Sequence, residues 1–526
     1  MSGSPRFPDA PVDLFVIGGG INGSGIARDA AGRGLSVVLA EMGDLAGATS
    51  SASTKLFHGG LRYLEFFEIA LVRKALIERE TLLRAMPHIS RPMRFVLPFH
   101  RDMRFDAETP TSRILSVVMP WMRGRRPAWL IRLGLFLYDH LGGRDILPGT
   151  TRLNLRLAPE GQVLQDRFSV AYEYSDCWVD DARLVVLNAR DAQSRGATVL
   201  TRTEVTHARV EDGLWHVTIR DTSGERVVRA KALINAAGPW VERVAKGVVR
   251  QPGKGQIRLV RGSHIVVPRI FDHDKAYFLQ GTDGRIIFAI PYEQDFTVIG
   301  TTEAGQDDPN TKPRCSDDER DYLCAFASKY FKTPVTSQDV VWTYSGVRPL
   351  YDDGARSATA ATRDYVLELN TGAGAPVLSV FGGKITTYRK LAEAVLRKLE
   401  PHLPVGDRWT AGVALPGGDF PVDGVADLVA ALRASYPFLT EPWAQRLVHA
   451  YGTEAVDVLG DAASIADLGR DFGGTLTGRE LEWLRDREFA VTADDVLWRR
   501  SKLGLRLNSD QRDAVEQAMR GAIATD

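Results

Sequence analysis

The sequence predicts an α/β fold that ends in a helical domain, and three observations support this prediction. Residues 13–41 contain a buried strand, a glycine-rich turn, a helix pattern and a second apolar strand in direct succession. Residues 377–400 repeat the order of strand, glycine turn and helix. From about residue 405 the pattern becomes helical and polar. Strands that alternate with helices are typical of a parallel sheet covered by helices.

The composition limits the class of protein. The chain has 526 residues, enough for two or three domains, and its 66 basic residues equal its 66 acidic residues, which gives no argument for nucleic-acid binding. Cys177, Cys315 and Cys324 are scattered without disulfide or metal spacing, which suits a reducing compartment. Residues 1–12 lack a secretory signal, and no stretch approaches the roughly 18 apolar residues of a spanning helix. We expect a cytoplasmic protein or one attached to a membrane face.

The first glycine turn carries a dinucleotide-binding fingerprint. Gly18-Gly19-Gly20-Ile21-Asn22-Gly23 directly follows the strand at residues 13–17. In this pattern the glycines let the backbone approach a pyrophosphate, and the helix N-terminus offers N–H groups and a positive dipole. Glu41 ends the second strand, where a carboxylate accepts from ribose hydroxyls. The sequence therefore predicts a bound dinucleotide; the alternative is a glycine-rich turn without a ligand.

The second glycine turn distinguishes between dinucleotides. Gly382-Gly383-Lys384 follows the strand at residues 377–381, and Thr386 lies at the start of the next helix. The N-terminus of that helix would stabilise the negative charge that appears at N1–C2=O of a flavin on reduction. A nicotinamide has no such requirement, so we expect FAD.

Residues 46–54 form a run of Ala, Ser, Thr and Gly, which suits a loop close to a ligand. Ser50, Ser51, Ser53 and Lys55 are expected to face the pyrophosphate or the isoalloxazine. Farther along, short strands between residues 256 and 301 favour an antiparallel sheet for a substrate domain.

One basic segment stands out in this neutral chain. Residues 91–144 contain ten arginines against four acidic residues, a net charge of +6, interleaved with large apolar residues such as Trp121 and Trp129. This pattern favours contact with an anionic membrane surface. The alternative is a core helix hairpin with arginines on its solvent face.

Several long segments resemble the FAD-dependent glycerol-3-phosphate dehydrogenases, in particular the bacterial aerobic, membrane-associated type. The resemblance runs from about Asp13 to Trp498, and the segments that carry it are residues 17–23, 50–65, 174–184, 342–349 and 379–390. It implies a glutathione-reductase-like FAD-binding (Rossmann-type) domain from residues 1–90, 150–250 and 350–404. It also implies a β-rich substrate cap at 251–349 and a helical C-terminal domain at 405–526. Residues 91–149 are then the basic membrane-facing segment.

The resemblance also implies a reaction. Glycerol 3-phosphate is oxidised at C2 to dihydroxyacetone phosphate, hydride passes to FAD, and electrons then pass to a membrane quinone. The protein is expected to be a homodimer, peripheral to the cytoplasmic face of the inner membrane. Between Arg101 and Arg126 the chain is longer than the bacterial relatives, and we expect the insertion around residues 107–124 to add membrane-facing surface.

Five positions match the substrate ligands of that family: Arg62, Tyr63, Arg348, Arg363 and Lys384. A phosphate dianion needs several cations, and arginine grips two oxygens at once. An amino-acid oxidase, the neighbouring class, needs only a carboxylate clamp, so this set favours a phosphorylated substrate. The alternative for each arginine is a solvated or salt-bridged surface position.

Oxidation of an alcohol also requires a group that accepts the hydroxyl proton, and a histidine suits this task. His58 is our candidate base, although it could instead orient the loop or the flavin. Arg348 is a second catalytic candidate, because it could polarise the C2 oxygen. His264 is a weaker candidate that could simply belong to the sheet.

The remaining cofactor contacts are expected at Ala237 and Gly238, because residues 235–238 resemble the second FAD contact strand of the superfamily; the alternative is ordinary strand packing. The full cofactor set is Gly18, Gly20, Asn22, Gly23, Glu41, Ser50, Ser51, Ser53, Lys55, Ala237, Gly238, Gly382, Gly383, Lys384 and Thr386. Two other functions remain open. One is an oxidase of the same fold that passes electrons to oxygen, and the other is a flavin-bearing interaction protein without catalysis.

Overall fold

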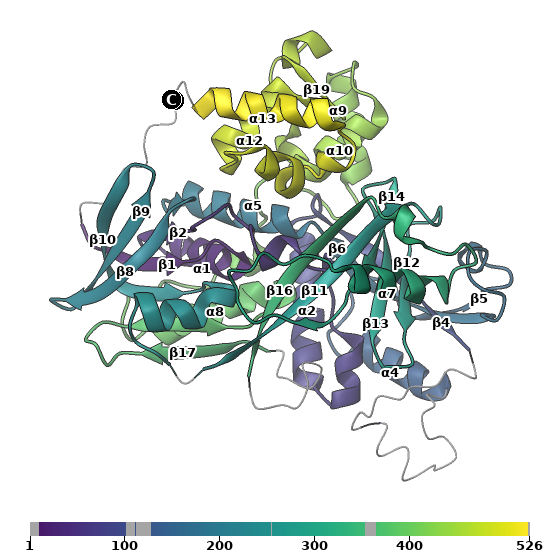
Figure 1. The fold of residues 1–526 in the computed structure, drawn as a ribbon, viewed down its shortest axis with the longest axis horizontal. Helices are drawn as coiled ribbons and strands as arrows, with labels where there is room; N and C mark the ends of the chain where they lie inside the picture. Colours follow the sequence, from purple (N-terminus) through teal and green to yellow (C-terminus); the bar gives the residue numbers. More distant parts are fainter. Residues whose placement is uncertain (1–9, 101–110, 112–127, 254, 353–363, 524–526) are drawn as a thin grey trace.

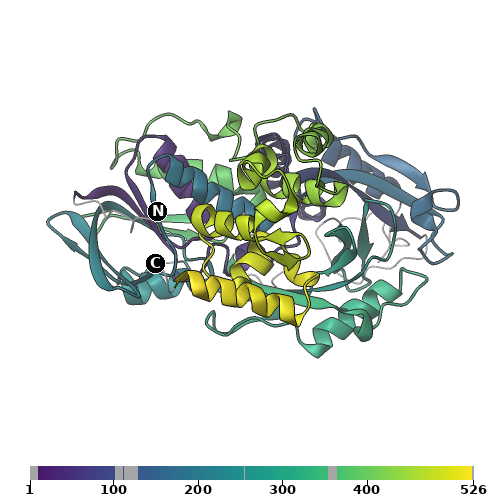
Figure 2. The ribbon, with the colours of Figure 1, turned by 90° about the horizontal axis from the view of Figure 1, so that it is seen from above.

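The structure is a computed structural model, and it describes residues 10–100, 111, 128–253, 255–352 and 364–523. These residues form two large β-sheets that lie side by side, with helices packed against both and a helical C-terminal domain above them (Figure 1). The view from above shows the C-terminal helices, in yellow, over the middle of the molecule (Figure 2).

The first sheet has eight strands among the described residues, and its centre is parallel. The strand order is β17-β18-β10-β1-β2-β7, and β18, β10, β1, β2 and β7 pair in parallel. Strands β8 and β9 extend it as an antiparallel continuation of β10. The bounds are β1 Val12–Ile17, β2 Val37–Ala40, β7 Thr198–Leu200, β8 Glu204–Glu211, β9 Leu214–Asp221, β10 Gly224–Asn235, β17 Val366–Asn370 and β18 Val377–Phe381.

Both faces of this sheet are buried. Helices α1 (Ile21–Gly32), α5 (Asp181–Ser194) and α8 (Tyr388–Leu399) pack on the face that carries Leu14 and Val16. On the opposite face Phe15 packs with Trp215 of β9. A parallel strand covered on both sides has an almost continuous apolar sequence, which is why the strand at residues 13–17 could be predicted.

The second sheet has ten strands among the described residues, in the order β15-β11-β14-β13-β12-β4-β6-β3, with β16 beside β11 and β5 beside β6. Helix α7 (Asp317–Ser328) packs on one face, and α2 (Ile69–Ala85) and α4 (Ala128–His140) pack on the other. The bounds are β3 Leu56–Phe57, β4 Ser90–Phe99, β5 Thr151–Asn154, β6 Val170–Val179, β11 Ile257–Pro268, β12 Ala276–Gln280, β13 Ile286–Tyr292, β14 Phe296–Gly300, β15 Ala304–Gly305 and β16 Trp342–Tyr351.

The second sheet takes strands from outside the substrate cap predicted at residues 251–349, including β3 from the range 1–90 predicted for the FAD-binding domain. Residues 150–179 were assigned to the first domain, but β5 and β6 pair with each other, and β6 also pairs with β4, within the second sheet. Strand β4, at the start of the basic segment, is likewise an interior strand of that sheet. The sequence pattern of residues 170–179 predicts a strand, but the sheet that it joins is decided by tertiary packing.

The C-terminal domain has an apolar core of its own. Its elements are α9 Val425–Ser435, α10 Glu441–Tyr451, α11 Ala455–Leu459, β19 Asp471–Gly473, β20 Leu476–Thr477, α12 Gly478–Glu488 and α13 Ser509–Ile523. Buried ion pairs join it to the first domain. In one of them Arg183 of α5 donates from Nη2 to Oε1 of Glu488 at 2.9 Å.

Helix α4 in the basic segment has a buried side and an exposed apolar side. Leu135 and Tyr138 are buried against the second sheet. Trp129, Leu133 and Phe136 project outward, with 51%, 47% and 56% of their surface exposed. The apolar run 114–122 and most of the insertion around 107–124 lie outside the described residues. In the part of the chain that the structure describes, we find no helix with the length and apolar character needed to cross a membrane.

Candidate active site

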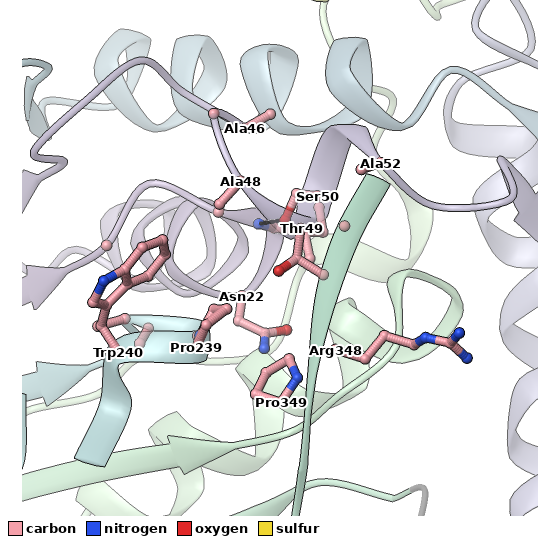
Figure 3. A pocket seen from close by; sticks show the side chains of 18 of the residues that line it. Asn22, Ala46, Ala48, Thr49, Ser50, Ala52, Pro239, Trp240, Arg348 and Pro349 are labelled. Atoms are coloured by element: carbon pink, nitrogen blue, oxygen red, sulfur yellow. Dashed lines mark hydrogen bonds between the residues drawn. The ribbon is translucent and has the colours of Figure 1, made fainter. Parts of the chain in front are cut away.

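A cavity of about 780 Å³ opens where the parallel strands of the first sheet end. It is lined by the residues that follow β1, β2, β10 and β18, and by residues of β16 from the second sheet. Its volume lies within the range of about 300–1,000 Å³ that is usual for ligand sites. The carboxyl edge of a parallel sheet is also the usual place for a nucleotide. In the close-up, Trp240 lies toward one end and Arg348 toward the other, with Asn22, Thr49 and Ser50 between them (Figure 3).

The glycine turn after β1 is closely packed at Gly18 and Gly23 and less crowded at Gly20, which lines the cavity. A Cβ on Gly18, whose φ is +107°, would lie 2.6 Å from the Ala236 carbonyl oxygen, and one on Gly23 would lie 1.8 Å from the Gly18 carbonyl oxygen. A Cβ on Gly20 would meet only Ser50 Oγ, at 3.1 Å. The N-terminus of α1 therefore has room for a phosphate group in front of it.

Two side chains shape the cavity wall around this turn. Ser50 Oγ accepts from the Ile21 N–H at 3.0 Å. The Glu41 carboxylate accepts from the N–H groups of Gly19 at 2.7 Å and Gly43 at 2.8 Å. Burial raises the pKa of Glu41, although these two N–H groups act in the opposite direction. Glu41 lines the cavity, where it can still accept from ribose hydroxyls.

The two ends of the chain's core meet in this cavity. Asn22 Nδ2, on α1, donates to the carbonyl oxygen of Gly382 at 3.0 Å. Asn22 Oδ1 is buried and has no hydrogen-bond partner among the described residues, so it can receive a donor from a ligand. Gly382 and Gly383 both have positive φ, at +72° and +102°. The predicted residues Lys384 and Thr386 follow them along the cavity wall.

The Arg348 end of the cavity is cationic. Arg348 donates from Nη2 to the Thr302 carbonyl oxygen at 3.0 Å. A Cβ on the facing Gly262 of β11 would lie 2.6 Å from that Nη2 atom, so the glycine makes room for the guanidinium. Lys384 Nζ lies 3.8 Å from the ring centroid of Tyr63. His58, whose N–H donates to Thr386 Oγ1 at 3.3 Å, lines the same region. Arg348 Nη1 also lies 3.6 Å from Glu303 Oε1. At this end of the cavity Arg348 and Lys384 provide two positive charges that suit an anionic ligand.

Most of the predicted residues line the cavity, and four described ones do not. Those that line it are Gly18, Gly20, Asn22, Glu41, Ser50, Ser53, His58, Tyr63, Ala237, Gly238, Arg348, Gly382, Gly383, Lys384 and Thr386. Gly23, Ser51, Lys55 and Arg62 are not among the lining residues. Arg363 lies outside the described residues.

Lys55 has a different position from the one expected. Its side chain is almost fully buried, and Nζ donates to Asp181 Oδ1 at 2.6 Å and to the Ser51 carbonyl oxygen at 3.1 Å. This ion pair turns the ammonium away from the cavity. Through these two contacts Lys55 connects the loop at residues 46–54 to α5.

His264, the second histidine considered as a candidate base, also lines the cavity. Its Nε2 lies 3.0 Å from Thr54 Oγ1, and its ring stacks on Tyr344 with centroids 4.6 Å apart. Burial, together with the charges of Lys55 and Arg348, holds its pKa well below the usual range. The imidazole is therefore neutral near pH 7.

Other lining residues were missed altogether. They include Thr301, Arg202 and Trp240, and from the C-terminal domain Thr492, Asp494, Asp495 and Arg499. No local pattern marks these positions, because they reach the cavity only through the packing of distant segments.

Comparison with known proteins places the chain among flavoenzymes. The family model for FAD dependent oxidoreductase matches residues 13–389, and the model for the C-terminal domain of alpha-glycerophosphate oxidase matches residues 408–523. The aerobic glycerol-3-phosphate dehydrogenase of Escherichia coli is 49% identical over 96% of this chain and 96% of its own length. The D-erythritol 1-phosphate dehydrogenase of Brucella abortus is 48% identical over 95% of this chain and 96% of its own length.

A solved structure extends the likeness to the fold. The glycerol-3-phosphate dehydrogenase from Bacillus halodurans, complexed with FAD, superposes with a TM-score of 0.69 at 25% identity. The match covers 98% of this chain and 94% of that one.

Proposed function

The chain belongs to the family of FAD-dependent glycerol-3-phosphate dehydrogenases, and from this premise we propose that it oxidises sn-glycerol 3-phosphate at C2 to dihydroxyacetone phosphate. FAD is its cofactor. The observation that carries the proposal is the presence of Arg348 and Lys384 in the same cavity as the Gly382–Gly383 turn. Cations for a phosphorylated substrate thus share one cavity with the residues suited to a flavin.

The cofactor residues divide by chemistry. Gly18, Gly20 and Ser50 stand at the N-terminus of α1, which suits the pyrophosphate. Glu41 is the residue for the ribose, and the Gly382–Thr386 turn suits the pyrimidine edge of the flavin. When bound, FAD supplies the acceptor for the hydride that leaves the substrate.

The substrate phosphate requires cationic hydrogen-bond donors in the cavity. Lys384 provides a compact ammonium, and Arg348 provides a planar fork of donors. Tyr63 lies beside Lys384 and holds it through a ring contact. Arg62 and Arg363 complete the proposed substrate set on the strength of the family resemblance.

The oxidation breaks two bonds of the substrate. The C2–H electron pair leaves as hydride, and the hydroxyl proton passes to a base as the C2=O bond forms. We assign this base to His58, with His264 as the second candidate because it lines the same cavity in its neutral form. Arg348 would stabilise the negative charge that develops on the C2 oxygen.

D-Erythritol 1-phosphate is a second candidate substrate. The relative named for it is 48% identical to this chain, against 49% for the E. coli glycerol-3-phosphate dehydrogenase, so identity does not separate the two. The test is kcat/KM for each compound with an artificial electron acceptor. We expect kcat/KM to be higher for glycerol 3-phosphate than for D-erythritol 1-phosphate. A preference for the four-carbon phosphate would reassign the substrate.

The proposed electron acceptor is a membrane quinone, reached from the cytoplasmic face of the inner membrane. The exposed apolar side of α4, within the arginine-rich segment, supports this assignment. An oxidase would instead release one hydrogen peroxide per substrate. Stoichiometric peroxide in air-saturated buffer without quinone would favour that alternative.

We include a homodimer in the proposal on family resemblance, and sedimentation equilibrium measures it.

A further inference from the structure

Residues of the C-terminal domain form part of the cofactor cavity wall. They are Thr492, Asp494, Asp495 and Arg499. The facing wall is made by residues 41–44 and 202–205 of the first domain. We call this part of the cavity the ribose end, because it contains Glu41 at the end of β2.

Asp44 and Arg500 make the strongest contact at the ribose end. Arg500 donates from Nη1 and Nη2 to the two carboxylate oxygens of Asp44, each at 2.7 Å. Neither side chain exposes more than 3% of its surface. Arg499 pairs with Asp44 as well. A bidentate pair fixes direction as well as distance, so the C-terminal domain holds the segment that follows β2 in one position.

Asp495 makes a second contact between the domains. Arg202 donates from Nη2 to Asp495 Oδ2 at 2.5 Å, and the N–H groups of Val491 and Thr492 donate to the same oxygen at 2.8 and 2.9 Å. Burial by itself would raise the pKa of Asp495, but those N–H groups and the charge of Arg202 hold it at about 2. The carboxylate is therefore ionised and remains paired at neutral pH.

The segment held by these pairs also contacts the glycine turn. Glu41 accepts from the Gly19 N–H at 2.7 Å, and the Ala46 N–H donates to the Gly19 carbonyl oxygen at 3.2 Å. Between these two contacts lies Asp44, which is bound to Arg500. One short segment therefore connects the pyrophosphate turn with the C-terminal domain.

We propose that the C-terminal domain completes the ribose end of the FAD site, so that docking of this domain and binding of FAD stabilise each other. A ligand that contacts only the docked arrangement favours that arrangement by its binding free energy, and the effect is reciprocal. The inference rests on the FAD assignment and does not depend on the substrate.

The test measures FAD affinity in the full-length chain. Flavin is removed, and FAD is titrated back while its fluorescence quenching is followed. We call the ion pairs of Asp44 with Arg499 and Arg500 the clamp. The variants are Asp44→Asn and Arg499→Gln, which weaken the clamp from opposite domains. The matched control is Asp461→Asn, because Asp461 pairs with Arg479 at 2.9 Å entirely within the C-terminal domain and is 96% exposed. We expect the FAD dissociation constant to rise at least tenfold in both variants and to change less than twofold in the control.

Limited proteolysis gives a second readout that does not require a variant to fold. FAD should slow tryptic cleavage between residues 400 and 425 of the unmodified apoprotein at least fivefold, because it holds the domain in place. Equal cleavage rates with and without FAD would overturn the proposal. So would clamp variants that keep a wild-type circular dichroism spectrum and bind FAD within twofold of wild type. No substrate is present in either experiment, so failure here leaves the proposed reaction untouched.

Discussion

Asn22 and Gly382 lie 360 positions apart in the sequence, yet the Asn22 side chain donates to the Gly382 carbonyl oxygen at 3.0 Å. This hydrogen bond joins the N-terminal end of α1, which suits the pyrophosphate, to the turn that suits the flavin ring. The Asn22 side chain thus connects the pyrophosphate half of the proposed cofactor site directly to the flavin half.

Replacing Asn22 should remove this connection and weaken the binding of FAD. Asn22→Ala removes one hydrogen bond worth about 1 kcal/mol and so should weaken FAD binding about fivefold. Fluorescence titration of the apoprotein measures the dissociation constant. Asn370→Ala, at the exposed end of β17, is the control and should bind FAD as the wild type does. Equal affinities for the two variants would remove Asn22 from the cofactor site.

Gly20 offers a test that separates folding from cofactor binding. A Cβ at this position would lie 3.1 Å from Ser50 Oγ, a close contact that a small movement of this hydroxyl can relieve, so Gly20→Ala should lower the free energy of unfolding of the apoprotein by only about 1 kcal/mol or less. The same methyl group would stand in the space for the phosphate, so FAD affinity should fall at least tenfold. Gly18→Ala is the contrasting variant. Its Cβ would lie 2.6 Å from the Ala236 carbonyl oxygen at a φ of +107°, and it should lose stability as well. A Gly20→Ala protein with wild-type FAD affinity would contradict the proposed place of the pyrophosphate.

These glycine contacts show what the sequence could predict. The turn at residues 18–23 is local, its glycines are required by contacts within a few residues or with the neighbouring strand, and the pattern was therefore readable. The second turn at 382–383 was predictable for a different local reason, because both glycines adopt a positive φ, at +72° and +102°. The contact between Asn22 and Gly382 was not, because it depends on how β1, β10 and β18 assemble into one sheet.

The two histidines of the cavity should differ in their effect on catalysis. His58→Gln is expected to lower kcat by about 10²- to 10⁴-fold, the usual contribution of a general base. His264→Gln is expected to cost less than tenfold. The pKa of His264 lies well below 6.5, so this residue stays neutral over the pH range 6–8 and its loss should leave the acidic limb of the kcat/KM profile in place. If only the His264→Gln variant loses the acidic limb of the kcat/KM profile, the base is His264 and not His58.

The exposed side of α4 predicts attachment to lipid. The double variant Leu133→Ser, Phe136→Ser removes two apolar side chains that are 47% and 56% exposed, while the buried residues Leu135 and Tyr138 keep the helix packed. Cosedimentation with vesicles of anionic phospholipid should fall at least fivefold relative to wild type. Val456→Ser, an exposed apolar residue of the C-terminal domain, is the control and should sediment as the wild type does. Unchanged sedimentation of the double variant would exclude α4 as the membrane contact.

The candidate site was predictable where residues act through local chemistry and unpredictable where they act through packing. His58, Tyr63 and Lys384 stand in recognisable motifs, and the structure brings them into one cavity. Lys55 stands in such a motif too, but a buried ion pair with Asp181 of α5 draws its ammonium out of the cavity. Arg499 reaches the cavity from the C-terminal domain by docking, which no sequence pattern expresses.

The central claim is that this chain transfers hydride from C2 of glycerol 3-phosphate to its FAD. The most direct measurement is the visible absorption spectrum of the purified holoprotein under anaerobic conditions as stoichiometric glycerol 3-phosphate is added. The account predicts that the absorption bands of oxidised flavin bleach, and that dihydroxyacetone phosphate forms in an amount equal to the flavin reduced. A flavin spectrum that stays unchanged at saturating glycerol 3-phosphate would contradict it.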